Sequence, residues 1–200
     1  MRNILIQERK SDKLQLNLTV QRVEPSVWYS LGFYKHHYLT ESLNKSCKCL
    51  LFRWNGVPCA FVAVLNTPRR GIPYGFAISR IVVLPDFQGL GLSSKILNFV
   101  GSIVLNSTEG ARMYIKTIHE LMGAYFTNSD KWRPTAFNGK QRSKKDQEFE
   151  RGKYNNRLQR ASFCFEYIGD KQDGYEELLL PIKELRNKKR YGKQLEIKFD

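Results

Sequence analysis

The stretch ISRIVVLPDFQGLGLSSKIL, residues 78–97, constrains the fold more than any other part of the chain. A β-branched run typical of a strand stops at Pro85, which cannot continue a hydrogen-bonded ladder. A turn with Gly89 and Gly91 follows, and an apolar periodic segment begins after two serines. A strand, a glycine turn and a helix in this order bring backbone N–H groups and a helix N-terminus together, which is how proteins bind anions. The sequence therefore predicts an α/β chain with an anion site at residues 88–93.

Two well-known nucleotide loops do not fit this turn. A Walker loop requires GxxxxGK[ST], and Lys95 does not stand at that spacing. A dinucleotide-binding fingerprint requires GxGxxG near the first strand, whereas residues 89–94 read GLGLSS and follow several strand-like segments. A strand-to-helix turn that binds no ligand stays open as an alternative.

Hydrophobic periodicity predicts the elements around the turn. Alternating or continuous apolar runs predict strands at residues 14–23, 48–54, 57–65, 76–84, 111–119 and 160–169. Helices are predicted at residues 25–39, from residue 92 onward with an apolar stripe, and at 120–132. Asn55-Gly56 between two strand-like runs is a strong signal for a tight hairpin.

The segment Gln88-x-x-Gly91-x-Ser93, with Pro85 before it, resembles the acyl-CoA loop of the GNAT superfamily of N-acyltransferases, Gln/Arg-x-x-Gly-x-Gly/Ala. The order of predicted elements over about residues 14–169 is similar to that family as well. The resemblance implies a GNAT-like α/β fold: a central mixed sheet with a splayed strand pair and flanking helices. It also implies acetyl-CoA, or another acyl-CoA, as cofactor, and transfer of the acyl group to an amine.

The same resemblance assigns cofactor contacts to the loop and to the strand before it. The residues implied are Val82, Val83 and Leu84 for the pantetheine arm, and Gln88, Gly89, Leu90, Gly91, Leu92 and Ser93 for the pyrophosphate. A backbone N–H of the strand would polarise the acyl carbonyl.

The groups that move protons are less evident from the sequence. Many relatives use a carboxylate on the splayed strand and a tyrosine on the helix after the next strand. The strand here has no carboxylate, and Phe126 takes the place expected for the tyrosine, with Tyr125 one position away. The catalytic candidates are His119, Glu120, Tyr125 and His37. Each has a structural alternative: a strand-end surface residue, a first-turn helix charge, a half-buried core aromatic and a histidine at a helix C-terminus, respectively.

The positive charge is concentrated late in the chain. Of a net charge of +14, residues 131–160 carry +7 and residues 183–198 carry +5. A GNAT-like domain is expected at 1–170, with a basic insertion at about 131–160, and a basic extension at 171–200. The two basic segments predict DNA or RNA as a possible partner, and solvated loops are the alternative.

Two further interpretations of the function follow from these features. His37-Tyr38 resembles the His-Tyr of Mom-type phage DNA-modification enzymes, which are diverged GNAT folds. A nucleic-acid-binding protein with a catalytically silent GNAT core is the other.

Cysteine usage and apolar run lengths bear on the compartment. Cys47, Cys49, Cys59 and Cys164 form no CxxC pair, which favours buried thiols. A zinc site with His36 or His37 is the weaker alternative. No apolar run is long enough for a membrane span, and the N-terminus has no long apolar region typical of a signal peptide. We therefore expect a cytoplasmic protein without a membrane contact.

Overall fold

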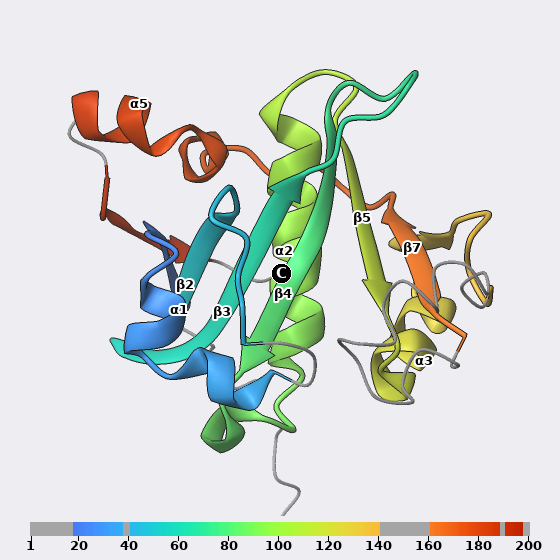
Figure 1. Cartoon of the computed structure of the whole chain (residues 1–200), viewed down its shortest axis with the longest axis horizontal. Helices are drawn as coiled ribbons and strands as arrows, with labels where there is room; N and C mark the ends of the chain where they lie inside the picture. Colours follow the sequence, from blue (N-terminus) through green and yellow to red (C-terminus); the bar gives the residue numbers. More distant parts are fainter. Residues whose placement is uncertain (1–17, 38–40, 141–160, 189–190, 198–200) are drawn as a thin grey trace, which may run out of the picture.

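The computed structural model describes residues 18–37, 41–140, 161–188 and 191–197, which form one mixed sheet with helices on both faces (Figure 1). The eight described strands lie in the order β6-β7-β5-β4-β3-β2-β1-β8. They are β1 (Leu18–Val23), β2 (Lys48–Trp54), β3 (Val57–Asn66), β4 (Gly75–Val83), β5 (Arg112–Thr117), β6 (Trp132–Pro134), β7 (Phe163–Tyr167) and β8 (Gln194–Ile197). The α/β class and the mixed sheet expected from the sequence are confirmed.

The helices are unequal in length. They are α1 (Val27–Ser30), α2 (Leu92–Ser107), α3 (Glu120–Asn128) and α5 (Ile182–Asn187), with 3-10 turns η1 (Phe33–His36), η2 (Pro85–Phe87) and η4 (Glu176–Leu179). The predicted apolar stripe of α2 is confirmed, since Ile96, Leu97, Val100, Ile103 and Val104 are fully buried against the sheet. Helices α2 and α3 pack on one face, and α1 and η1 cover β2 and β3 on the other (Figure 1).

The splayed strand pair is confirmed at β4 and β5. These parallel strands pair at three positions only, from Gly75 opposite Arg112 to Ala77 opposite Tyr114. Beyond Ala77, β4 continues to Val83 beside β3, while β5 pairs with β7. The edge of β4 that faces β5 therefore borders a gap from residue 78 onward.

A β-bulge lies where this gap opens. Ala63 of β3 is opposite Arg80, but its neighbour Val64 is opposite Ile78, so Ser79 is an extra residue in β4. Bulges bend a strand and increase its twist. The bend accompanies the divergence of β4 from β5.

The hairpin at Asn55-Gly56 is also confirmed. Both residues have positive φ, 49° and 82°, as a type I′ turn requires. These two residues connect β2 and β3 directly.

The prediction of one helix over residues 25–39 is wrong. Gly32 adopts φ 71° and divides this stretch into α1 and η1, and His37 after it is extended. The division lets both Trp28 and Phe33 bury their rings against Phe61. Burial of two aromatic side chains outweighs a continuous helix in this stretch.

Parts of several predictions lie outside the described residues. These are residues 14–17 of the first expected strand, Tyr38, residues 141–160 of the basic insertion, and residues 189–190 and 198 of the second basic segment. Within the insertion, β6 pairs with β7. Within the expected extension, β8 pairs with β1, and Leu178 and Leu179 are buried in the main core. The domain boundary at residue 170 stays a prediction.

Candidate functional site

The turn between β4 and α2 has the left-handed backbone that its glycines predict. Gly89 and Gly91 have φ of 79° and 70°, a conformation that costs other residues about 1–2 kcal/mol. A Cβ built on either glycine would meet no atom within 4 Å. Space is therefore left beside the backbone at both positions, as the close approach of a ligand requires.

The side chain of Gln88 stabilises the turn. Its Nε2 donates to the carbonyl of Val83 at 2.9 Å, and its backbone N–H donates to the carbonyl of Pro85 at 3.1 Å. The Gln88 N–H is thus already engaged, and the N–H groups that could meet an anion begin at Gly89.

The start of α2 supplies the next N–H groups. Gly91 is the N-cap residue, and its carbonyl accepts the first helical hydrogen bond, from the N–H of Lys95 at 3.4 Å. The N–H groups of Leu92, Ser93 and Ser94 precede that bond and are the ones a helix leaves without intrahelical partners. The hydroxyl of Ser94 donates to the Gly91 carbonyl at 2.8 Å, so Ser94 rather than Ser93 stabilises this end.

A cavity of about 240 Å³ lies against this turn. It connects the end of β4, the loop, the first turn of α2 and α3. Its lining residues are Val83, Phe87, Gln88, Gly89, Gly91, Leu92, Ser93, Ser94, Met122 and Tyr125. Seven of the ten lining residues were expected from the sequence: Val83, Gln88, Gly89, Gly91, Leu92, Ser93 and Tyr125. Val82, Leu84 and Leu90 are not among the lining residues, and Phe87, Ser94 and Met122 were not foreseen.

Tyr125 is the catalytic candidate that the fold brings to this cavity. Its hydroxyl donates to Oδ1 of Asn98 on α2 at 3.1 Å, and the same oxygen accepts from Nε1 of Trp132 at 2.8 Å. Phe126 instead lies in the core, with its ring centroid 4.7 Å from that of Trp132. Tyr125, one position before the place expected for the tyrosine, thus lies half-buried in the wall of the cavity.

The other candidates on α3 lie away from the cavity lining. His119 is exposed and is the N-cap of α3, with Nδ1 accepting from the N–H of Met122 at 3.4 Å. Glu120 is exposed in the first turn of that helix. A capping role accounts for the place of His119.

His37 lies on the opposite face of the sheet. Its ring is 5.8 Å from that of Trp28 in an edge arrangement. Burial, and secondarily the positive charge of Arg80, lowers the pKa of His37 to about 4. The imidazole is therefore neutral at pH 7, on the side of β4 away from the cavity.

The cysteines are buried thiols, as the sequence favoured. Burial raises the pKa of Cys49 to about 12 and of Cys59 to about 11, so both are protonated at neutral pH. Within the described ranges, no three His, Cys, Asp or Glu side chains gather as metal ligands do. None of the described helices is both long and apolar enough to span a bilayer.

Comparison with solved structures places this arrangement among known folds. Arabidopsis thaliana Naa50, in complex with a bisubstrate analogue of CoA, is similar over 76% of this chain and 99% of its own, with a TM-score of 0.54 and 12% identity. A chimera of the Vibrio cholerae spermidine N-acetyltransferase SpeG with hSSAT is similar over 82% of this chain and 99% of its own, with a TM-score of 0.55 and 9% identity.

A third neighbour contains the cofactor that the loop suggests. The Salmonella typhimurium protein yncA, with its cofactor acetyl-CoA, is similar over 78% of this chain and 96% of its own, with a TM-score of 0.51 and 14% identity. No protein-family model and no curated protein sequence matches the chain. The similar structures include acetyltransferases, one of them described as of the GNAT family. The chain has the fold of that superfamily: β4 and β5 splay apart, and the glycine loop leads from β4 into α2.

Proposed function

We propose that the protein is an acyl-CoA-dependent N-acyltransferase that transfers an acetyl or other acyl group to an amine. The observation that carries the proposal is the loop at Gly89–Ser94. It joins left-handed glycines, unpaired helix N–H groups and a cavity at the point where β4 has left β5. Anions bind at such helix termini because the N–H groups and the helix dipole both favour negative charge.

The residues present fit the diphosphate of CoA. Open space at Gly89 and Gly91 lets the anion approach the backbone, and the loop carries no carboxylate after Asp86. The cavity of about 240 Å³ is smaller than a typical pocket for a whole ligand, about 300–1,000 Å³. It fits one portion of an extended cofactor whose pantetheine arm lies along the gap-facing edge of β4, at Val82, Val83 and Leu84.

Bound acyl-CoA supplies an acyl carbon activated as a thioester and a thiol leaving group. We assign to Tyr125 the role of the acid that protonates the departing sulfur. Asn98 orients its hydroxyl, and α3 fixes the ring at the cavity. His37, His119 and Glu120 are candidates for the base that takes a proton from the amine. Of these, His37 is neutral at pH 7 and lies across β4 from the cavity.

Cofactor binding tests the first part of this proposal. Gly91→Glu places a carboxylate beside the loop and should abolish CoA binding measured by calorimetry. The matched control is Gly110→Glu, since Gly110 has φ 74° and open space around it but lies after the C-terminus of α2. The control should bind CoA as the parent does. Equal CoA affinity in the two variants, or no affinity in the parent, would refute the acyltransferase proposal.

Turnover tests the roles in proton transfer. Tyr125→Phe should lower turnover by about 10²–10⁴-fold while CoA affinity is kept, because only the hydroxyl is removed. The alanine variants of His37 and His119, and Glu120→Gln, test the base in the same assay. If Tyr125→Phe keeps activity within a few-fold of the parent, the acid is another group.

The acceptor that we propose is a nucleic acid or a protein bound to one. Twelve of the fourteen net positive charges fall in residues 131–160 and 183–198. Mass analysis of DNA, RNA and protein after incubation with acyl-CoA identifies the modified molecule. Modification of a DNA base would favour the Mom-like interpretation. Nucleic-acid binding without CoA turnover would favour a silent core.

A further inference from the structure

The half of the sheet formed by β5, β7 and β6 has two chemically different faces. Side chains alternate along a strand, so one set points to α2 and α3 and the other points away. Met113, Ile115, Phe165 and Trp132 are buried on the helix side. The strand register places the other set together on the second face: Arg112, Tyr114 and Lys116 of β5, Cys164 and Glu166 of β7, and Arg133 of β6.

The cations of this second face are solvent-accessible, whereas Cys164 on the same face is buried. The side chains of Arg112 and Arg133 are 50% and 59% exposed, and Lys116 is exposed as well. Helix α1 and turn η1 pack over β2, β3 and Val82 of β4, on the other half of this face. No described helix contributes a buried residue over β5, β7 and β6 on this side.

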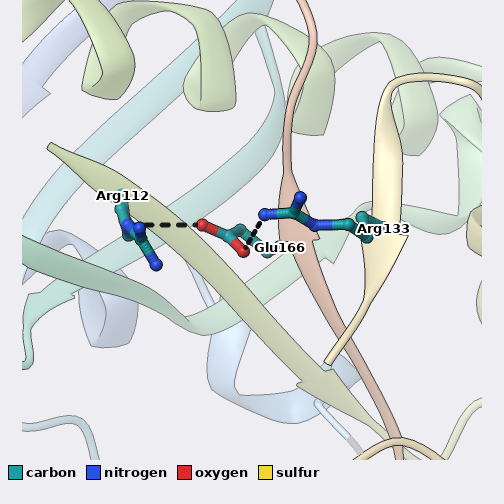
Figure 2. Close-up of polar contacts among 3 residues, drawn as sticks. All are labelled: Arg112, Arg133 and Glu166. Atoms are coloured by element: carbon teal, nitrogen blue, oxygen red, sulfur yellow. Dashed lines mark hydrogen bonds and ion pairs between the residues drawn. The ribbon is translucent and has the colours of Figure 1, made fainter. Parts of the chain in front are cut away.

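The charge of the face is almost entirely positive. Its described carboxylate, Glu166, is 13% exposed and lies between two arginines (Figure 2). Oε2 of Glu166 accepts from Arg133 at 2.9 Å, and Oε1 lies 3.7 Å from Nε of Arg112. The triad keeps a net charge of +1 and fixes both guanidinium groups on the surface.

Two further cations lie on this side of the sheet. The guanidinium of Arg69 lies over the ring of Tyr114, 4.7 Å from its centroid. Arg80 of β4 lies opposite Ala63, and its guanidinium donates to the carbonyls of Ser42 and Ser79 at 3.0 and 2.7 Å. With Lys116, the described face carries six charged groups and a net charge of +4. From Arg112 to Lys116 the cations follow β5 over about 13 Å, a length over which one strand of B-form DNA carries about four phosphates.

An exposed aromatic ring lies beside the start of β7, at the end of this half of the sheet where β4 and β5 have separated. Phe137 is 63% exposed, and the ammonium of Lys140 lies 5.8 Å from its ring centroid. The turn that holds both is tied to the start of β7 by the bond from the Gly139 N–H to the Ser162 carbonyl at 3.0 Å. Cations interleaved with an exposed aromatic ring are the features that bind single-stranded nucleic acid.

We propose that this face, defined by Arg69, Arg80, Arg112, Tyr114, Lys116, Arg133, Phe137 and Lys140, binds a single-stranded nucleic acid as the acceptor. This face borders the part of β4 beyond Ala77 that no longer pairs with β5, along which the pantetheine arm is proposed to lie, so an amine of the bound nucleic acid would approach the acyl group from this edge of β4. The assignment of the nucleic acid as acceptor rests on the proposed acyltransferase function, whereas the binding of the nucleic acid to this face does not. The net positive charge of this face repels polycationic amines, which are therefore not the acceptors that it binds.

Two substitutions on exposed side chains test the proposal, with anisotropy of a short fluorescein-labelled single-stranded oligonucleotide as readout. Lys116→Glu should weaken binding and flatten the slope of log K against log salt by about 0.7. Phe137→Ala should weaken binding by roughly 5- to 150-fold through loss of base stacking. The matched control is Lys171→Glu. Lys171 is exposed, and the backbone N–H of its neighbour Gln172 donates to the carbonyl of Ser102 in α2, so this lysine lies by the helix on the other side of the sheet. Its effect should be much smaller.

Calorimetric titration with CoA keeps the two proposals distinguishable. All three variants should bind CoA as the parent does, because none of the substituted residues lines the cavity. A parent that binds CoA but no oligonucleotide at low salt would overturn the nucleic-acid face and leave the acyltransferase proposal intact. Equal losses in Lys116→Glu and Lys171→Glu, or tighter binding of labelled polyglutamate than of the oligonucleotide, would also overturn it.

Discussion

Gly101, in the middle of α2, allows the helix to lie close against β7. A Cβ at this position would lie 2.5 Å from Cγ of Tyr167 and 2.7 Å from both Cδ atoms, which is well inside van der Waals contact. Tyr167 cannot move aside easily. It is 3% exposed, and its ring centroid is 5.1 Å from that of Trp132, which is itself buried.

The substitution Gly101→Ala sets two effects against each other. Alanine is favoured over glycine inside a helix by about 1 kcal/mol. Overpacking a well-filled core costs about 1–3 kcal/mol, and a contact this short against a fixed ring belongs at the upper end. We expect a net loss of about 1–2 kcal/mol in the free energy of unfolding, or about 2–8 °C in Tm for a chain of this size.

Urea unfolding followed by tryptophan fluorescence measures this loss. The Tyr167→Ala background is the control, because there the ring is absent and Gly101→Ala should stabilise the helix by up to about 1 kcal/mol. A Gly101→Ala protein as stable as the parent, or more stable, would refute the close packing of α2 on Tyr167.

Two other predictions concern groups around the candidate site. Asn98→Leu should cost about 1–3 kcal/mol in the free energy of unfolding, measured in urea, because the buried indole N–H of Trp132 loses its acceptor. The same substitution should lower turnover in the acyl-transfer assay, because the hydroxyl of Tyr125 loses the group that orients it. Burial and Arg80 lower the pKa of His37 from 6.5 to about 4. As the pH falls, the unfolded chain therefore binds a proton at His37 at a higher pH than the folded chain does. The stability linked to His37 is present above about pH 6.5 and lost as the pH falls toward 4. After allowance for solvent screening this amounts to about 1–2 kcal/mol, and His37→Gln should lack it in urea unfolding at pH 5 and pH 7; identical pH dependence in both proteins would contradict the prediction.

The sequence predicted the part of the fold in which local chemistry decides the backbone. Asn55-Gly56 and the loop at Gly89 and Gly91 need positive φ, and few other residues adopt it, so the hairpin and the strand-loop-helix unit could be located. The stripe of α2 is apolar at helical spacing and is buried as that spacing requires.

Long-range packing decides what the sequence did not reveal. Strand β8 has four residues, only two of them apolar, and forms because β1 is available as a partner. The choice between Tyr125 and Phe126 at the cavity depends on the rotation of α3, which burial of Phe126 against Trp132 and Phe165 fixes. In the face of β5, β7 and β6, the paired strands β5 and β7 lie more than forty residues apart in the sequence, so no local pattern indicates the face.

The pairing of β1 with β8 also sets an order of events during synthesis. β1 begins at Leu18, and its partner β8 ends at Ile197, so this pairing cannot be completed until residue 197 has left the ribosome. An unpaired strand edge is a template for association with other chains. A chain that stops before residue 194 would keep that edge open permanently, and aggregation rather than loss of cofactor binding is the failure expected of it.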